Sequence, residues 1–419
     1  MKNKLINLLI LFFIFICFLI IKNYKIKHLE PIFKKIEEFE SSLKNSFIFT
    51  FFIENDLTKI KKFWNLNEKD KLIDNINLYN FHKSEKPDIS VIITVYNQEK
   101  CFYKALRSVQ NQSLKNIEII IVDDFSVDNS IKIIENYQKN DPRIILLKHS
   151  HNYGTIKSRS DGIKLAKGKY ITIIDGDDGF AIPDILYKCI NIAKIGNLDV
   201  IEFKGAYFLN NYFIKIENHL NTISNLNNRI IYQPELKYKF IKLQKENNWS
   251  YLNRNIWSKF IKNEIFNKVL EYIGPKYTED CILNLEDTIM SVSLFIISNS
   301  YYLIKEPGYY RSKSEKWKNI SKQNKNHFGK CVTNIKLDSI KYLYFLSEKL
   351  RNDNITRNLI YNEFFKIDNN LNLCKYEKNS INDVIKLLNL ILYKFTFDNY
   401  KQRNRFFECK IRLDEGKIL

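Results

Sequence analysis

Glycine, proline and cysteine are all scarce in this sequence of 419 residues. It has 11 glycines and 7 prolines, which excludes collagen-like chains and low-complexity segments rich in these two residues. The 7 cysteines are scattered and form no C-x-x-C pair, so neither a disulfide scaffold nor a zinc ribbon is expected. Hydrophobic residues make up 45% of the chain, which is enough to form a large folded core.

Several catalytic signatures are also missing. The chain has no G-x-S-x-G, no H-E-x-x-H and no G-x-x-x-x-G-K, which argues against a serine hydrolase, a zinc peptidase and a P-loop enzyme. No G-x-G-x-x-G follows the first predicted strand, which argues against a dinucleotide dehydrogenase. The net charge of +19 favours anionic partners, although a solvated surface rich in lysine would give the same excess. No nucleic-acid motif accompanies this charge, and no nucleic-acid partner is expected.

The N-terminal segment 5–21 is apolar over 17 residues, with Asn7 as its single polar interruption. As a helix it would span roughly 25 Å, near the short end for a membrane-spanning segment. No small residues precede Lys22 as a cleavage site, so we expect an uncleaved signal anchor in residues 1–27 rather than a signal peptide. The sequence thus predicts a single-pass membrane protein of endoplasmic reticulum/Golgi type or of the plasma membrane. Its orientation stays open, because lysines flank both ends of the segment.

Beyond a polar stem at 28–86, strands and helices alternate. Runs rich in β-branched and aliphatic residues predict strands at 89–95, 117–122, 144–147 and 170–174, with helices between them. This order is typical of an α/β fold with a mostly parallel sheet covered by helices on both faces. We divide this part into two halves, 87–205 and 206–312, and expect a helix around 256–270. Helical periodicity at 313–419 predicts a helical C-terminal region.

Polar clusters stand where the predicted strands end. They comprise Tyr96-Asn97, Asp123-Asp124 and the run Asp175-Gly176-Asp177-Asp178. Ligands of such sheets bind at the carboxyl ends of the strands. Three carboxylates within four residues would suit Mg²⁺ or Mn²⁺ bridging to a diphosphate, and Asp124 could accept a hydrogen bond from a base or a ribose. The alternatives are an ordinary Asp- and Gly-rich turn and a helix cap.

These segments resemble the family 2 glycosyltransferases. Five motifs occur in the family's order over about 95 residues, with weaker similarity to about residue 312. They are Ser90–Asn97, Ala105–Ser113, Glu118–Ser126, Asn152-Tyr153-Gly154 and the DGDD run at 175–178.

The resemblance implies a GT-A fold and transfer of a sugar from a nucleotide donor, expected to be a UDP-sugar, with inversion at the anomeric carbon. It implies a glycan, lipid or protein acceptor and a hexosyl or N-acetylhexosaminyl donor group. By the resemblance, Mn²⁺ or Mg²⁺ would lie on the DxD pair Asp175 and Asp177, with Asp178 adjacent. The nucleotide would be held by Thr94, Tyr96, Asp124, Arg159 and Asp175.

The family's catalytic base is the Asp of a Glu-Asp pair before a helix, and two such pairs are present. We assign the base to Asp287 rather than Asp280, because Ile289, Val292 and Ile296 continue on one helical face after Asp287. Asp287 would then lie near a helix N-terminus, which favours the ionised carboxylate that a base requires.

Two positions depart from the family pattern. Thr94 stands where the family usually has proline, and Phe125 places a bulky ring where glycine or asparagine is usual. A catalytically inactive relative that binds a glycan or a partner is the alternative function, and the intact DGDD run argues against it. A nucleotidyltransferase would need a Gly-rich phosphate loop after the first strand, where Tyr96-Asn97-Gln98-Glu99 stands instead.

Overall fold

A computed structural model describes residues 82–209, 213–216, 229–236, 255–279 and 285–311, together with Tyr342, Phe345 and Lys349. Among these residues, no helix is long and apolar enough to cross a membrane. The predicted anchor, Asp280, most of the stem and most of the C-terminal region lie outside them.

The first half of the sheet is parallel and places β1 (Ile89–Val95) in its middle. On one side of β1 lie β2 (Ile117–Asp123) and then β3 (Ile144–Lys148), and on the other side lies β4 (Tyr170–Asp175). The side chains of β1, β2 and β4 are almost all buried, which explains their nearly continuous apolar sequences. The direction in which strands are added reverses between β1 and β4, and this switch point is where ligands of open α/β sheets bind.

The second half of the sheet is mixed. Strand β9 (Lys259–Lys262) runs antiparallel to both β4 and β6 (Val200–Leu209), and β10 (Ser300–Arg311) is parallel to β6. Short antiparallel pairings complete it, made by β5 (Gly179–Phe180), β7 (Phe213–Ile216) and β8 (Ile231–Tyr232). The prediction of a mostly parallel sheet is therefore correct for β1 to β4. In the second half the pairing of β6 with β10 is parallel and the other described pairings are antiparallel, because strands there often follow one another without an intervening helix.

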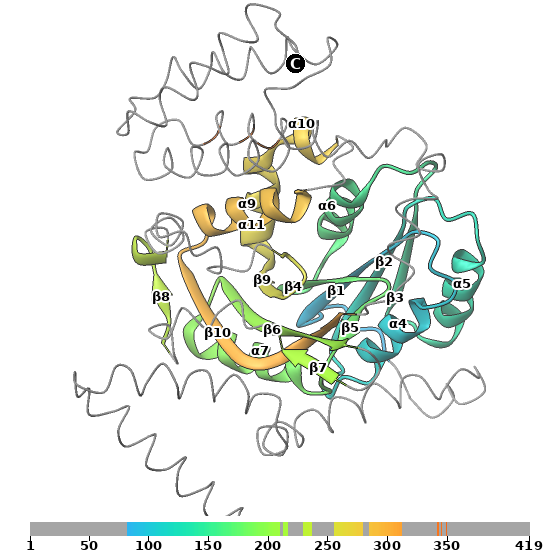
Figure 1. Ribbon diagram of the computed structural model, residues 1–419, viewed down its shortest axis with the longest axis horizontal. Helices are drawn as coiled ribbons and strands as arrows, with labels where there is room; N and C mark the ends of the chain where they lie inside the picture. The colour runs from blue at the N-terminus through green and yellow to red at the C-terminus, as the bar shows by residue number, and fades with distance from the viewer. Residues whose placement is uncertain are drawn as a thin grey trace, which may run out of the picture. The chain divides into compact units, whose positions relative to one another are not determined.

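Helices cover both faces of the sheet (Figure 1). One layer consists of α4 (Phe102–Gln110), α5 (Ser130–Asn140) and α7 (Ile185–Gly196), whose apolar faces share a core with alternate residues of β1 and β2. The opposite layer consists of α6 (Thr155–Leu165), α9 (Asn263–Ile273) and α11 (Glu286–Ile297), with the short α10 (Pro275–Thr278) after α9.

Helix α6 lies very close to the sheet. A Cβ at Gly162 would come within 2.6 Å of a methyl carbon of Ile92, so only glycine allows this packing. The close approach brings the polar residues of α6 to the carboxyl edge of β1, β2 and β4, where the predicted site lies.

Candidate active site

Arg159 of α6 joins two distant acidic segments. Its side chain is 2% exposed, and its Nη2 lies 2.9 Å from Oδ1 of Asp175 at the end of β4. Its Nη1 donates to Oδ1 of Asp287, which stands 128 positions further along the chain. Oε1 of Glu286 lies 3.8 Å from the same Nη1. One guanidinium therefore brings the predicted metal-binding aspartate and the predicted base to one place.

Glu286 and Asp287 form the first turn of α11, as the sequence predicts for Asp287. Burial raises the pKa of Glu286 to about 8, and the negative charge of Asp287 adds to this shift. Burial also raises the pKa of Asp287, against the opposing effect of Arg159. The expectation that the helix N-terminus would favour the ionised form is therefore wrong in its net direction, because desolvation outweighs it.

The DGDD turn is shaped by Tyr309 of β10. The Tyr309 hydroxyl donates to Oδ2 of Asp178 at 3.0 Å and accepts from the backbone N–H of Asp175 at 3.2 Å. Its ring is buried and stacks on Trp257 with 4.3 Å between centroids. Asp178 is thus buried and engaged by a tyrosine, which argues against its predicted role in a metal site. The sequence identified the aromatic strand but not this contact.

Asp175 and Asp177 remain as donors for a divalent cation. Asp175 is 31% exposed and uses Oδ1 for Arg159, and Asp177 is partly exposed. A Cβ at Gly176 would lie 1.9 Å from Oε1 of Gln98, a buried oxygen with no hydrogen-bond partner among the residues that the structure describes. Among the described residues, no group of three or more His, Cys, Asp or Glu side chains converges. Two carboxylates nevertheless fit Mg²⁺ or Mn²⁺, which usually completes its shell with substrate phosphates and water.

Asp124 follows β2 and is 5% exposed. Its Oδ1 accepts from the backbone N–H of Tyr153 and its Oδ2 from that of Gly154, both at 2.8 Å, just before α6 begins. Oδ1 also lies 2.8 Å from Nδ1 of His149. A carboxylate offers about four acceptor positions, so one is left on Asp124 for a nucleotide.

Two of the other predicted nucleotide-binding residues, Thr94 and Tyr96, lie near Asp124, whereas Arg159 and Asp175 pair with each other. The backbone N–H of Asp124 donates to the carbonyl of Val95 at 2.8 Å, next to Thr94 and Tyr96. The backbone carbonyl of Thr94 accepts a hydrogen bond from the backbone N–H of Gly176 at 3.0 Å. Burial raises the pKa of the Tyr96 hydroxyl. The ends of β1, β2 and β4 thus meet, as the sequence predicts.

Phe125 adopts a left-handed backbone conformation, with φ at 68°, and its side chain is 45% exposed. Left-handed φ values disfavour bulky residues, which explains why glycine or asparagine is usual at this position in the resembling family. The ring is held at the surface beside Asp124, at the expense of backbone strain.

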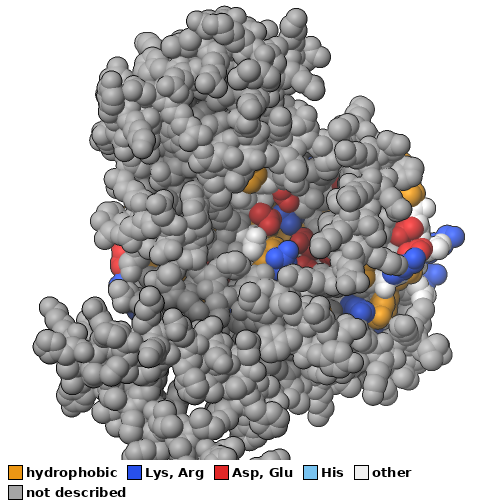
Figure 2. All heavy atoms as spheres, viewed as in Figure 1, with side chains coloured by type: hydrophobic (Ala, Val, Ile, Leu, Met, Phe, Trp, Pro, Cys, Tyr) orange, Lys and Arg blue, Asp and Glu red, His pale blue; other side chains and the backbone are white. Residues whose placement is uncertain are grey.

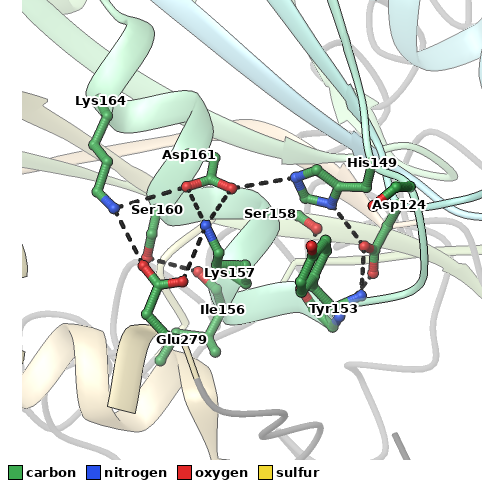
Figure 3. Close-up of polar contacts among 12 residues, drawn as sticks. Asp124, His149, Tyr153, Ile156, Lys157, Ser158, Ser160, Asp161, Lys164 and Glu279 are labelled. Carbon is green, nitrogen blue, oxygen red and sulfur yellow. Dashed lines mark hydrogen bonds and ion pairs between the residues drawn. The ribbon is translucent and has the colours of Figure 1, made fainter. Parts of the chain in front are cut away.

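A series of ion pairs connects Asp124 with residues of α6, and the sequence did not predict it (Figure 3). Nε2 of His149 lies 3.2 Å from Asp161, whose Oδ2 is 2.7 Å from Nζ of Lys157. Glu279, at the end of α10, lies 3.2 Å from Lys157 and 3.5 Å from Lys164. The i,i+4 spacing of Lys157 and Asp161 was the only sign of these ion pairs in the sequence.

In the space-filling view, acidic and basic side chains lie together in a hollow near the middle of the face (Figure 2).

Known proteins resemble this chain in sequence. Residues 90–270 match the family model described as Glycosyl transferase family 2. Glycosyltransferase GlyG of Streptococcus pneumoniae is 27% identical over 224 residues, which cover 52% of this chain and 71% of that protein. The UDP-Glc:alpha-D-GlcNAc-diphosphoundecaprenol beta-1,3-glucosyltransferase WfaP of Escherichia coli is 33% identical over 152 residues, which cover 36% of this chain and 56% of that protein.

A solved structure resembles it in fold. The crystal structure of residues 1–349 of TarS from S. aureus, in complex with UDP-GlcNAc, matches with a TM-score of 0.53. The match covers 78% of this chain and 91% of that chain at 15% sequence identity. At this identity the likeness establishes the fold alone, an α/β architecture with a mixed sheet.

Proposed function

We propose that the chain is a family 2 glycosyltransferase, because residues 90–270 match that family's model, and that it transfers a sugar from a nucleotide-diphosphate donor to an acceptor hydroxyl by direct displacement. The observation that carries this proposal is the pairing of Arg159 with both Asp175 and Asp287 at the carboxyl edge of the sheet. Donor-side and acceptor-side segments meet there, as a single displacement requires.

The donor we propose is a UDP-sugar carrying a hexosyl or N-acetylhexosaminyl group. Support comes from the name of WfaP, which specifies UDP-Glc, and from the TarS complex with UDP-GlcNAc. The name of WfaP also specifies a sugar linked to diphosphoundecaprenol as the acceptor. We therefore favour a lipid-linked glycan as the acceptor here, at a membrane to which the predicted anchor 5–21 would hold the enzyme.

In the proposed mechanism, Asp287 accepts the proton of the acceptor hydroxyl. The acceptor oxygen bonds to the anomeric carbon as the bond to the diphosphate oxygen breaks on the opposite face, so the configuration inverts. Arg159 holds the Asp287 carboxylate in place and limits the upward pKa shift caused by burial. Asp175 and Asp177 would hold Mn²⁺ or Mg²⁺, which would neutralise charge on the departing diphosphate.

Titration of UDP into the full-length protein in detergent tests the donor site. Binding should require Mn²⁺ or Mg²⁺ and should weaken at least tenfold in Asp177→Ala, because the bridging cation loses a carboxylate. Asp184→Ala is the matched control, since Asp184 is an exposed aspartate paired with Lys188. Hydrolysis of a nucleotide-sugar panel then identifies the donor.

Equal UDP affinity in EDTA and in Asp177→Ala would contradict the role of the cation. Absence of binding to every nucleotide would instead support the alternative of an inactive, partner-binding relative.

A further inference from the structure

We infer that His149 is a positioning residue of the donor site, an imidazolium that fixes the carboxylate of Asp124 against the start of α6. What binds at Asp124 rests on the proposed function, whereas the charge state and contacts of His149 do not. No sequence motif assigned a role to this histidine.

Both ring nitrogens of His149 face carboxylates. Nδ1 lies 2.8 Å from Asp124 and Nε2 lies 3.2 Å from Asp161, and the His149 side chain is 6% exposed. A neutral imidazole has one N–H and one lone pair, so one carboxylate would then face a lone pair without water between them. Only the protonated ring carries a hydrogen on both nitrogens: Nδ1 hydrogen-bonds to Asp124, while Nε2, which has no hydrogen-bond partner among the described residues, faces Asp161 at 3.2 Å as an ion pair.

The surroundings of His149 are charged on each element that packs against it. Asp124 follows β2, while Asp161 comes from α6 and is paired with Lys157, with Lys164 at 3.7 Å. The ring of Tyr153 meets the imidazole edge-on at 5.0 Å. Burial alone would lower the pKa of His149, but the two carboxylates outweigh it and raise the pKa to about 9.

This arrangement fixes the orientation of the Asp124 carboxylate. Oδ1 accepts from His149 and from Tyr153, and Oδ2 accepts from Gly154, so the carboxylate is held on both oxygens. The acceptor position that remains on Oδ2 then points in one direction. Loss of the His149 donor removes one of these bonds and frees the carboxylate to rotate, which should weaken donor binding and leave the chemical step unchanged.

Two substitutions separate the hydrogen bond from the charge. In His149→Asn the side-chain amide takes the place of Nδ1 and can still donate to Asp124, whereas His149→Ala cannot. At pH 7 with Mg²⁺, calorimetry should give a UDP dissociation constant roughly 10- to 100-fold higher for His149→Ala and within a few-fold of wild type for His149→Asn. The kcat of each variant should match that of the wild type. Lys148→Ala, an exposed neighbour paired with Glu135, is the control.

A pH series provides a readout that loss of packing would not change. In the wild type, UDP affinity should be constant to about pH 8 and should then weaken only a few-fold, to the level of His149→Asn, as pH rises through the pKa of His149, about 9, because the neutral ring can still donate from Nδ1 to Asp124. The Asp161→Asn variant keeps the contact with Asp124 but loses one carboxylate, so this decline should begin at lower pH. His149→Asn should show no such decline. NMR titration of the His149 ring in the protein without nucleotide should give the same midpoint.

A His149 ring that titrates below pH 7, or an alkaline decline that persists in His149→Asn, would overturn the inference. So would a folded His149→Ala protein that binds UDP as the wild type does. If the wild type binds no nucleotide, the proposed function fails, and the NMR titration still decides whether His149 carries its charge.

Discussion

Two clusters of charged side chains meet on α6, and they differ in their balance of charge. The first, which we call the His149 cluster, sets three cationic groups against three carboxylates along the path of Figure 3. Its members are His149, Lys157, Lys164, Asp124, Asp161 and Glu279. The second, the Arg159 cluster, sets one guanidinium against three carboxylates. Its members are Arg159, Asp175, Glu286 and Asp287.

This difference in charge balance suggests a structural function for the His149 cluster and a reactive one for the Arg159 cluster. Paired charges at the His149 cluster hold Asp124 against the residues that precede α6, without any ligand. At the Arg159 cluster, burial raises the pKa of both Glu286 and Asp287, and neighbouring carboxylates add to these shifts. The excess of carboxylates leaves negative charge that a divalent cation or a proton would neutralise. A displacement reaction needs a cation for its leaving group and a base for its nucleophile, and the cluster with excess carboxylates suits both.

The largest effect should come from replacing the proposed base. Asp287→Asn keeps the shape of the side chain but cannot take a proton, so turnover should fall by about 10² to 10⁴ while UDP affinity persists. Steady-state kinetics and UDP calorimetry on the same preparations measure both quantities. Asp280→Asn is the comparison variant and should lose much less activity. The reverse ranking would transfer the assignment to Asp280, and a few-fold loss in both would place the base elsewhere.

Replacement of Arg159, the cationic member of the Arg159 cluster, should test whether carboxylates are in excess there. Arg159→Gln removes a buried guanidinium from three partly exposed carboxylates and should lower the free energy of unfolding by about 3–5 kcal/mol. Arg143→Gln is the matched control, because Arg143 is equally buried and pairs with Asp141 at 2.8 Å. Mn²⁺ should raise the melting temperature of Arg159→Gln more than that of the wild type or of Arg143→Gln. Equal Mn²⁺ effects in all three would contradict an excess of negative charge at the Arg159 cluster.

Glu286 should make folding stability fall with pH. Its pKa is about 8 in the folded protein against an ordinary value of 4.5, so the folded state binds its proton more tightly. The resulting stability is fully present below about pH 4.5 and is lost as pH rises through 8. Glu286→Gln cannot lose a proton, so at pH 9 it should be more stable than the wild type, by on the order of 2 kcal/mol relative to the difference at pH 5. Urea unfolding at both pH values measures this change, and a pH-independent difference would refute the raised pKa.

The smallest effect concerns the strained loop beside the His149 cluster. Phe125→Gly should stabilise the protein by about 0.5–1 kcal/mol, because glycine adopts the left-handed φ of 68° without strain. Val127→Gly, at an exposed position without a positive φ, should destabilise it by a similar amount. Urea unfolding compares the two variants. A Phe125→Gly protein that loses as much stability as Val127→Gly would show that contacts of the Phe125 ring stabilise the protein by more than the strained backbone destabilises it.

Much of the first half of the sheet could be predicted from the sequence. The runs of β-branched residues at β1, β2 and β4 are apolar because these strands are buried on both faces, and that pattern is local. The acidic residues Asp124 and Asp175 follow two of these strands, so their proximity followed from the parallel order of the sheet. The position of Asp287 in the first turn of α11 was also readable, from the spacing of the apolar residues behind it.

Two expectations failed for one shared reason, and for the same reason the sequence did not reveal the partner of Asp178, whose metal role stays a prediction. Asp178 is engaged by Tyr309, and residues 259–262, predicted as part of a helix, form β9 between β4 and β6. The pKa of Asp287 is raised rather than lowered. Each outcome depends on a partner more than 80 positions away in the sequence or on burial by the assembled layers. The periodicity of apolar residues within one segment carries no information about distant partners or about burial by other layers.

The sequence by itself determined the strands up to β4, the carboxylates at their ends and the helix that begins with Glu286 and Asp287, because these depend on local patterns of apolar residues and on turn chemistry. Only the tertiary structure decided which charges meet. Arg159, Asp161 and Lys157 lie within five residues on α6, yet Arg159 turns to Asp175 and Asp287 while the other two join His149. Residues two positions apart on a helix point in different directions, so the packing of α6 against the sheet assigned each charge to its cluster.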